Sequence, residues 1–215
     1  MNAMYKDFVL LPIDHVRLQG DLIVPDQAQG LVIFSHGSGS SRFSPRNKMV
    51  AEHLWMHRIA TLLFDLLTEA EDQDYQNRFD IELLTKRLIC ATRWVQQQDR
   101  LKHLPIGYFG ASTGAASALG AAAVLGQAIW AVVSRGGRPD LAIEVLPDVT
   151  APTLLLVGEW DGEVVELNRA AFHHIRAEKK LEIVSGAAHL FEEPGKLEEV
   201  ADLATDWYLE HLGKP

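Results

Sequence analysis

The sequence predicts a single α/β domain with a mostly parallel sheet of eight strands and helices on both faces. Short apolar runs alternate with longer segments of helical periodicity through most of the chain, which is typical of parallel strands joined by helices. With 215 residues, 47% of them hydrophobic, the chain can bury a sizeable core. Because this length is short for two domains, we expect one domain over residues 1–215.

The first two strands are expected to pair antiparallel, because Pro12 and Asp14 favour a tight turn between them. The six later strands are mostly separated by helical segments, which indicates parallel neighbours. The expected strands are Phe8–Leu11, Val16–Val24, Leu31–Ser35, Ala60–Asp65, Ile106–Phe109, Ile129–Ser134, Thr153–Val157 and Leu181–Val184.

Five segments carry the periodicity of helices that pack on a sheet. They are Arg46–His57, Ile81–Gln98, Thr113–Leu125, Val164–Ala177 and Lys196–Leu212. The polar, acidic connection Thr68–Asp80 is too short for a domain linker and can border a ligand site. Arg135–Pro152 is too short for a large helical lid, so we expect an open site.

The bulk charge and the lone cysteine limit the function classes. A net charge of −9 argues against nucleic acid or an anionic membrane as a general partner. Cys90 cannot form an intrachain disulfide and is expected to be a buried, inert thiol. No stretch approaches the roughly 18 apolar residues of a membrane span. We therefore expect a cytoplasmic protein.

A possible nucleophile stands between the fifth expected strand and the helix that follows it. Residues 110–114 read Gly-Ala-Ser-Thr-Gly, the GxSxG pattern of a sharp strand-to-helix turn. Ser112 in such a turn has strained backbone geometry, and glycine is needed two residues before and after it to avoid collisions. This context favours Ser112 as a nucleophile over a merely tight helix start.

A serine nucleophile needs a base, which in this chain order should follow it. His189 is the one later histidine that follows a strand through a loop, Ser185–Ala188, and could reach the carboxyl edge of the sheet. The other histidines after Ser112 lie in expected helices: His173, His174 and His211. His189 is therefore the predicted general base.

The acid that orients the histidine should follow the strand Thr153–Val157, whose carboxyl end lies at the same edge. Asp161 is preferred because it sits further out in the loop, although a helix N-cap would also explain an aspartate there. Glu159 is the rival acid.

Two backbone N–H groups are needed to hold the oxyanion of an acyl-transfer reaction. We expect the N–H of Thr113 to be one and the N–H of Ser38 the other, with Gly37 beside it in the small-residue loop after the third strand. His36 precedes the nucleophile and is interpreted as a buried histidine that stabilises this loop.

Four blocks of the sequence resemble α/β-hydrolases of the dienelactone hydrolase-like group, in the family's order. They read VIFSHGSGSS (Val32–Ser41), GYFGASTGAA (Gly107–Ala116), LLLVGEWD (Leu154–Asp161) and GAAHLF (Gly186–Phe191). The resemblance implies an α/β-hydrolase fold and ester or lactone hydrolysis without a cofactor. It matches Ser112, Asp161 and His189 to the catalytic triad, and Ser38 and Thr113 to the oxyanion hole.

The chain departs from that family at one position. Dienelactone hydrolases proper carry cysteine at the nucleophile turn, where this chain has Ser112. A subgroup with a run similar to SRGGRPDL (Ser134–Leu141) includes members attached to phosphoribosyltransferase domains.

Four arginines follow the third and sixth strands, at the edge where Ser112 is expected. They are Arg42, Arg46, Arg135 and Arg138. Because guanidinium groups bind carboxylates and phosphates in a bidentate way, these side chains could bind an anionic small-molecule substrate. Structural pairing, for example of Arg138 with Asp140, is the competing interpretation.

No metal or nucleotide site is predicted. His53 and His57 have the spacing of a zinc pair, but Glu52 precedes the first histidine and no third ligand is placed. Gly136 and Gly137 lack the Lys and Ser/Thr of a phosphate loop.

The function predicted from these residues is two-step acyl transfer, in which a small ester, lactone or thioester is cleaved through an acyl-enzyme on Ser112. The alternative is a non-catalytic binding or regulatory module that keeps the fold. Transfer of the acyl group to an acceptor other than water is a third possibility.

Overall fold

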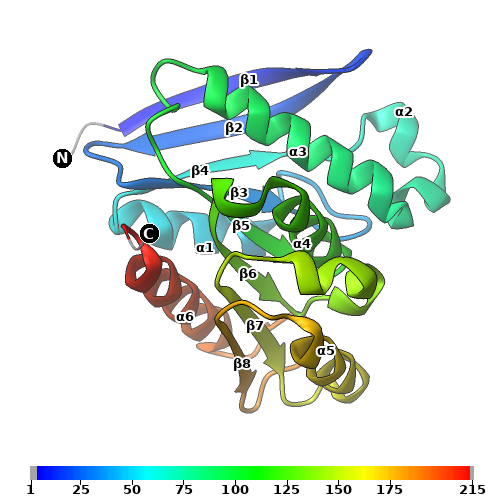
Figure 1. Ribbon diagram of the computed structural model, residues 1–215. Helices are drawn as coiled ribbons and strands as arrows, with labels where there is room; N and C mark the ends of the chain where they lie inside the picture. The colour runs from blue at the N-terminus through cyan, green and yellow to red at the C-terminus, as the bar shows by residue number, and fades with distance from the viewer. Residues whose placement is uncertain (1–3, 214–215) are drawn as a thin grey trace.

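A computed structural model describes residues 4–213, so residues 1–3, 214 and 215 of the predicted domain lie outside the described part (Figure 1). Its eight strands form one sheet in the order β1-β2-β4-β3-β5-β6-β7-β8. β1 with β2 and β2 with β4 are antiparallel, and the other neighbours are parallel. The strands are β1 (Met4–Ile13), β2 (Val16–Pro25), β3 (Gly30–Ser35), β4 (Ile59–Phe64), β5 (Ile106–Ala111), β6 (Ile129–Arg135), β7 (Thr153–Gly158) and β8 (Lys179–Val184).

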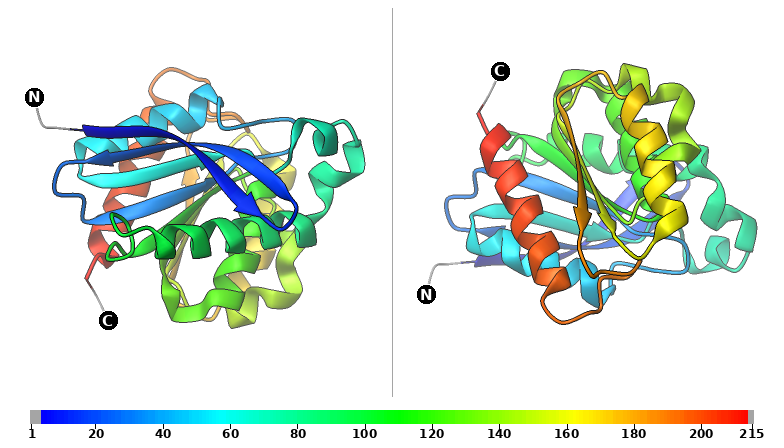
Figure 2. Two further views of the ribbon diagram at one scale, coloured as in Figure 1. Left: turned by 90° about the horizontal axis from the view of Figure 1, so that it is seen from above. Right: turned by 90° about the horizontal axis from the view of Figure 1, so that it is seen from below.

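Helices cover both faces of the sheet, as the sequence predicts (Figure 2). α1 and α6 contact each other on one face, and α3 and α4 contact each other on the other, where α5 also lies. The α-helices are α1 (Pro45–Met56), α2 (Glu69–Asp72), α3 (Ile81–Gln97), α4 (Thr113–Leu125), α5 (Gly162–His174) and α6 (Lys196–His211). Three 3₁₀ segments complete the chain: η1 (Tyr75–Phe79), η2 (Gly126–Ala128) and η3 (Pro139–Asp148).

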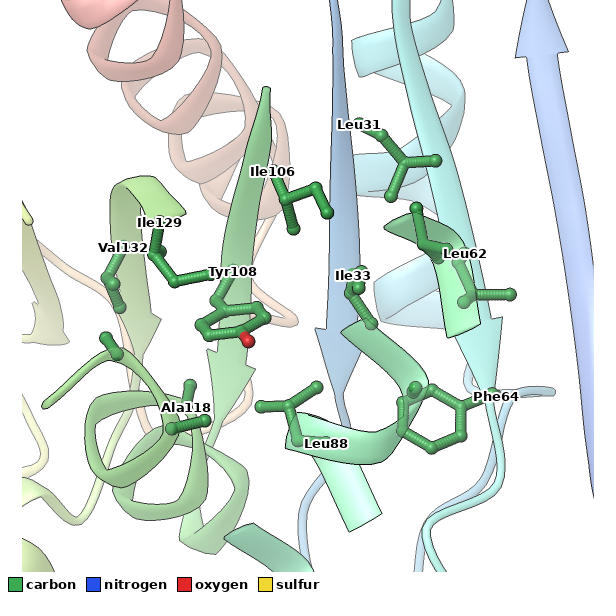
Figure 3. Close-up of a cluster of buried hydrophobic side chains, with 14 of the residues drawn as sticks. Leu31, Ile33, Leu62, Phe64, Leu88, Ile106, Tyr108, Ala118, Ile129 and Val132 are labelled. Carbon is green, nitrogen blue, oxygen red and sulfur yellow. The ribbon is translucent and has the colours of Figure 1, made fainter. Parts of the chain in front are cut away.

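The central strands are buried on both faces, which holds their carboxyl ends at fixed places. Every residue of β3, β4, β5 and β7 is buried. Figure 3 shows Ile33, Phe64 and Tyr108 from three strands packed with Leu88 of α3 and Ala118 of α4. This apolar layer fixes the start of α4, and with it the turn that carries Ser112.

Some elements differ from the expectation. β1 is ten residues long rather than four, because it pairs with β2 along its whole length while its outer face is exposed and shows little apolar alternation. Cys90 is half-buried, so the expectation of a fully buried thiol is wrong: α3 packs its side chain against the edge of the core. None of the helices in residues 4–213 is long and apolar enough to cross a membrane.

The two connections singled out in the sequence are ordered. Thr68 and Glu71 form a capping box at the start of α2, within the connection Thr68–Asp80. The segment between β6 and β7 is the kinked 3₁₀ stretch η3, which packs against α4 and α5. No large lid stands over the carboxyl edge in the described residues.

Candidate active site

Ser112 lies in a strained turn between β5 and α4. Its backbone has φ 51° and ψ −124°, a conformation that non-glycine residues rarely adopt and that is retained where the surroundings enforce it. A β-carbon on Gly110 would lie 2.5 Å from Ala115 Cα, and one on Gly114 would lie 2.1 Å from the Ser35 carbonyl oxygen. Both glycines are therefore required by backbone that passes too close for any side chain.

The neighbours of Ser112 come from two other loops. Its N–H donates to the Arg135 carbonyl at 3.2 Å, and its carbonyl accepts the Arg138 N–H at 3.0 Å. On the other side, a β-carbon on Gly37 would lie 3.0 Å from Ser112 Cβ. Among residues 4–213 no side chain hydrogen-bonds the Ser112 hydroxyl. The backbone and β-carbon of Ser112 thus lie between the loops after β3 and β6.

His189 and Asp161 are brought together by the loops after β8 and β7. His189 Nδ1 lies 2.5 Å from Asp161 Oδ2. Asp161 occupies the N-cap position of α5 but its side chain makes no capping bond there, so its carboxylate is directed to the histidine. A proton on Nδ1 donated to this carboxylate leaves Nε2 as an acceptor, which a general base requires.

Glu159, the rival acid, has a different role. Its Oε2 accepts the Gly186 N–H and the Ser185 hydroxyl, each at 2.8 Å. These bonds, the one from Gly186 first, lower the pKa of the Glu159 carboxyl below its ordinary value. Glu159 therefore fixes the loop that leads to His189, while Asp161 contacts the histidine itself.

The loop after β6 lies against the histidine. A β-carbon on Gly136, where φ is 50°, would lie 3.1 Å from the His189 carbonyl oxygen and 3.5 Å from its ring atoms Cε1 and Nδ1. Since Ser112 bonds to Arg135, one residue earlier, the segment 135–138 borders both Ser112 and His189. Sequence reasoning missed this role of Gly136; the signal was a glycine pair directly after a buried strand.

The loop after β3 packs against the start of α4, but the Ser38 N–H is not free. It donates to Thr113 Oγ1 at 2.9 Å, so the expected second oxyanion donor is already bonded. The N–H of Thr113 has no hydrogen-bond partner in the described chain, and α4 has no side-chain cap. The Thr113 N–H is therefore available to an oxyanion, at the positive end of a 13-residue helix.

His36 supports that loop, as the sequence indicates. Its Nε2 accepts the Leu66 N–H at 3.1 Å, so its Nδ1 carries the proton and lies 3.0 Å from the Gly37 carbonyl oxygen. Burial lowers the pKa of His36, because the charged imidazolium is disfavoured there. Both ring nitrogens are therefore engaged within the chain.

Arg42 and Arg138 each form an ion pair with a carboxylate, as Arg46 also does with Glu192. Arg42 forms an ion pair with Asp65, which also accepts the Arg42 N–H at 2.8 Å. Arg138 makes two bonds of 2.8 Å to Asp140, the structural pairing that the sequence left open. Their charges are neutralised within the chain.

The other two arginines lie near each other beside the histidine loop. Arg46 donates to Glu192 at 2.7 Å, and its Nε is buried without a partner. The guanidinium of Arg135, a residue only 6% exposed, makes no hydrogen bond or ion pair with the rest of residues 4–213, and its Nε is buried. It lies 6.0 Å from the Phe191 ring. Burial, with the charge of Arg46, lowers the pKa of Arg135 to about 10.

A cavity of about 500 Å³, lined by both polar and apolar side chains, lies beyond the loop after β3. Its lining includes His36, Ser40, Arg42, Asp65 and Thr68. The connection Thr68–Asp80 therefore borders an open cavity next to the site.

The described residues hold no group of three or more His, Cys, Asp or Glu side chains that could bind a metal ion. His53 Nε2 lies 2.9 Å from Asp202 Oδ1, which accepts from it, and His57 Nδ1 lies 2.9 Å from the His53 carbonyl oxygen. The two rings are partnered on the α1 surface.

The sheet order, the strained serine turn and the three loops at one edge define an α/β-hydrolase fold. A solved dienelactone hydrolase from Anabaena variabilis is 49% identical, with a TM-score of 0.94, over 97% of this chain and 99% of that one. The chain belongs to the dienelactone hydrolase-like family of the α/β-hydrolases.

More distant comparisons agree on the fold. Est1E from Butyrivibrio proteoclasticus has a TM-score of 0.82 at 18% identity, covering 96% of this chain and 99% of that one. No family model matches the chain. The Anabaena variabilis protein is a dienelactone hydrolase by name, and at 18% identity the likeness to Est1E shows the fold alone.

Two curated Mycobacterium tuberculosis proteins, from strains CDC 1551 and H37Rv, are each 56% identical to the chain over 200 residues, or 93% of it. They are named provisionally as phosphoribosyl transferases. The chain spans only 45% of their length.

Proposed function

We propose that the chain is a serine hydrolase that cleaves a small ester, lactone or thioester through an acyl-enzyme on Ser112. The contact between His189 Nδ1 and Asp161 carries the proposal, because it leaves Nε2 as an acceptor, and His189 lies against Gly136 in the segment whose backbone bonds to Ser112. Asp161 stands at the N-cap of α5, where an aspartate usually accepts a backbone N–H, but its carboxylate contacts His189 and makes no capping bond. This is not expected of a merely structural histidine.

The reaction runs in two steps that use the chain's own groups and water. Ser112 Oγ attacks the carbonyl carbon while His189 Nε2 takes its proton, and the imidazolium then protonates the leaving oxygen or sulfur. His189 next takes a proton from water, whose oxygen attacks the acyl-enzyme carbonyl, and returns it to Ser112 Oγ as the acid is released. The Thr113 N–H stabilises the oxyanion in both steps.

Labelling with a fluorophosphonate, followed by mass spectrometry of the peptides, tests the nucleophile. We expect one adduct, on Ser112, and none in Ser112→Ala or after prior incubation with p-nitrophenyl acetate at low temperature. Ser117→Ala is a control at a nearby buried serine. A folded wild-type chain that takes no label would favour the non-catalytic binding module.

We further propose that the substrate carries a negative charge near the scissile bond. A buried cation is costly to leave unpaired, yet Arg135 has no carboxylate partner in the described residues and has Arg46 as a like-charged neighbour. Its backbone is bonded to Ser112 and the next residue lies against His189. A substrate carboxylate could supply the missing partner, bound in a bidentate way.

Matched esters test this preference. For p-nitrophenyl hydrogen succinate against p-nitrophenyl butyrate, we expect a higher kcat/KM for the anionic ester, and a loss of that advantage in Arg135→Gln. Arg169→Gln, which removes an exposed arginine of α5, is the control. Equal rates for the two esters in the wild type, unchanged in Arg135→Gln, would leave Arg135 without a substrate role.

A further inference from the structure

The Thr113 side chain joins the start of α4 to the loop after β3, beside Ser112, and its hydroxyl proton has no partner in the described residues. Thr113 is 3% exposed and begins α4, directly after Ser112. Its Oγ1 accepts the Ser38 N–H at 2.9 Å, and this is its one hydrogen bond in the described residues. A hydroxyl has one proton to donate besides the lone pairs that accept, so the Thr113 O–H remains unused.

The Ser38 N–H can hardly serve an oxyanion while this bond persists. A backbone N–H has a single proton, and at 2.9 Å that proton is well engaged by Oγ1. The loop after β3 has little room to move and free this N–H. The backbone of Ser35 and His36 is in tight contact with Gly114, and Gly37 is in contact with Ser112. The geometry favours a hydrogen-bond chain that keeps the Ser38 bond intact.

We propose that the Thr113 hydroxyl is the second oxyanion donor, with the Ser38 N–H behind it. In this arrangement the oxyanion accepts from both the N–H and the O–H of Thr113, while Oγ1 accepts from Ser38. An N–H bond to Oγ1 polarises the hydroxyl, so successive bonds in such a chain strengthen one another. Thr113 then is a catalytic residue through its side chain as well as its backbone. This inference rests on the acyl-enzyme mechanism proposed for Ser112.

The rival arrangement makes the opposite prediction for one substitution. If Thr113 Oγ1 only blocks the Ser38 N–H and must rotate away, Thr113→Val frees that N–H, and hydrolysis keeps its rate or becomes faster. If the hydroxyl is the donor, Thr113→Val removes it without changing the shape of the side chain. Loss of one oxyanion donor lowers kcat by about 10²-fold, with KM nearly unchanged because the interaction forms mainly in the transition state.

The experiment measures p-nitrophenyl acetate hydrolysis by the wild type, Thr113→Val and Thr113→Ser. We expect Thr113→Ser, which keeps the hydroxyl, to retain most of kcat. Thr205→Val is the matched control, since Thr205 is also a buried helical threonine whose hydroxyl bonds only within its own helix, to Ala201. Thermal unfolding of each variant shows whether it is folded.

A second readout observes the hydrogen bonds directly. The infrared stretch of the acyl-enzyme carbonyl falls as donors bind its oxygen, so it should lie higher in Thr113→Val than in the wild type and Thr113→Ser. A folded Thr113→Val with wild-type kcat and an unshifted carbonyl stretch overturns the proposal. Absence of a Ser112 adduct in the wild type overturns the acyl-enzyme mechanism itself, which separates the two failures.

Discussion

The carboxyl edge of the sheet has two halves that are built in different ways. In the serine half, comprising Gly37, Ser38, Ser112 and Gly114, the loop after β3 lies so close to the start of α4 that a β-carbon on Gly114 would be 2.1 Å from the Ser35 carbonyl oxygen. In the histidine half, comprising Gly136, Asp161 and His189, backbone bonds and Glu159 also join the loops, but the orientation of the imidazole ring depends on one side-chain bond of 2.5 Å to Asp161. We therefore expect activity to be lost by steric substitutions in the serine half, and by removal of one hydrogen-bond acceptor in the histidine half.

The largest effect is expected in the histidine half, for Asp161→Asn. An amide can donate to Nδ1, which places the imidazole proton on Nε2 and removes the acceptor that Ser112 needs. In a serine triad such a change lowers kcat by about 10⁴-fold with little change in geometry. Ester hydrolysis by purified protein measures it, with Glu166→Gln, an exposed change on α5, as the control.

A result near wild type for Asp161→Asn would mean that another group orients His189. The orientation of His189 would then not depend on Asp161, which would contradict the difference drawn between the two halves.

The next effect is expected in the serine half, for Gly114→Ala. A β-carbon 2.1 Å from the Ser35 carbonyl oxygen must push α4 and the loop after β3 apart. We expect a loss of about 3 kcal/mol in the free energy of unfolding and, from the displaced donors, a fall of about 10²-fold in kcat. Urea unfolding and kinetics measure both. Gly162→Ala is the matched control, since nothing lies within 4 Å of its β-carbon position.

The two halves also differ in how well the sequence predicts them. Gly110 meets a local steric requirement, because its β-carbon would collide with Ala115, and the motif predicts the strained turn at Ser112 even though Gly114 is required by the distant backbone of Ser35. His189 and Asp161 could be proposed from chain order and elimination, but their contact depends on how two loops fold. The bond between Ser38 and Thr113 joins residues 75 positions apart, and no local pattern indicates it.

The arginines illustrate the same limit. The pairing of Arg138 with Asp140 spans two residues and was visible as an alternative. Arg46 pairs with Glu192, 146 residues away, and only the packing of α1 against the histidine loop reveals it. The extent of β1 was underestimated for a related reason: its pairing with β2, rather than its own apolar pattern, determines its length.

A smaller, pH-dependent effect is expected at His36, in the serine half. Burial places its pKa below the ordinary 6.5, so the folded chain binds fewer protons there than the unfolded chain. The stability from neutral His36 is therefore complete above pH 6.5 and declines as the pH falls toward the folded pKa. Urea midpoints should fall less steeply with acid in His36→Gln than in the wild type. Parallel curves would show that this imidazole does not couple the loop to pH.

The smallest effect is expected for Glu159→Gln, in the histidine half. Glu159 accepts the Gly186 N–H and the Ser185 hydroxyl through one oxygen, and an amide oxygen can accept both of these bonds as well. The lowered pKa of Glu159 means that its ionised form stabilises the loop above its ordinary pKa, and that this contribution is lost as the pH falls through the lowered value. Because the carboxylate is exposed, we expect kcat at neutral pH to change by only a few fold.

Kinetics of Glu159→Gln and Asp161→Asn, measured side by side, therefore rank the two acids. A larger loss in Glu159→Gln would assign the orienting role to Glu159, and the bond between Asp161 and His189 would then be structural.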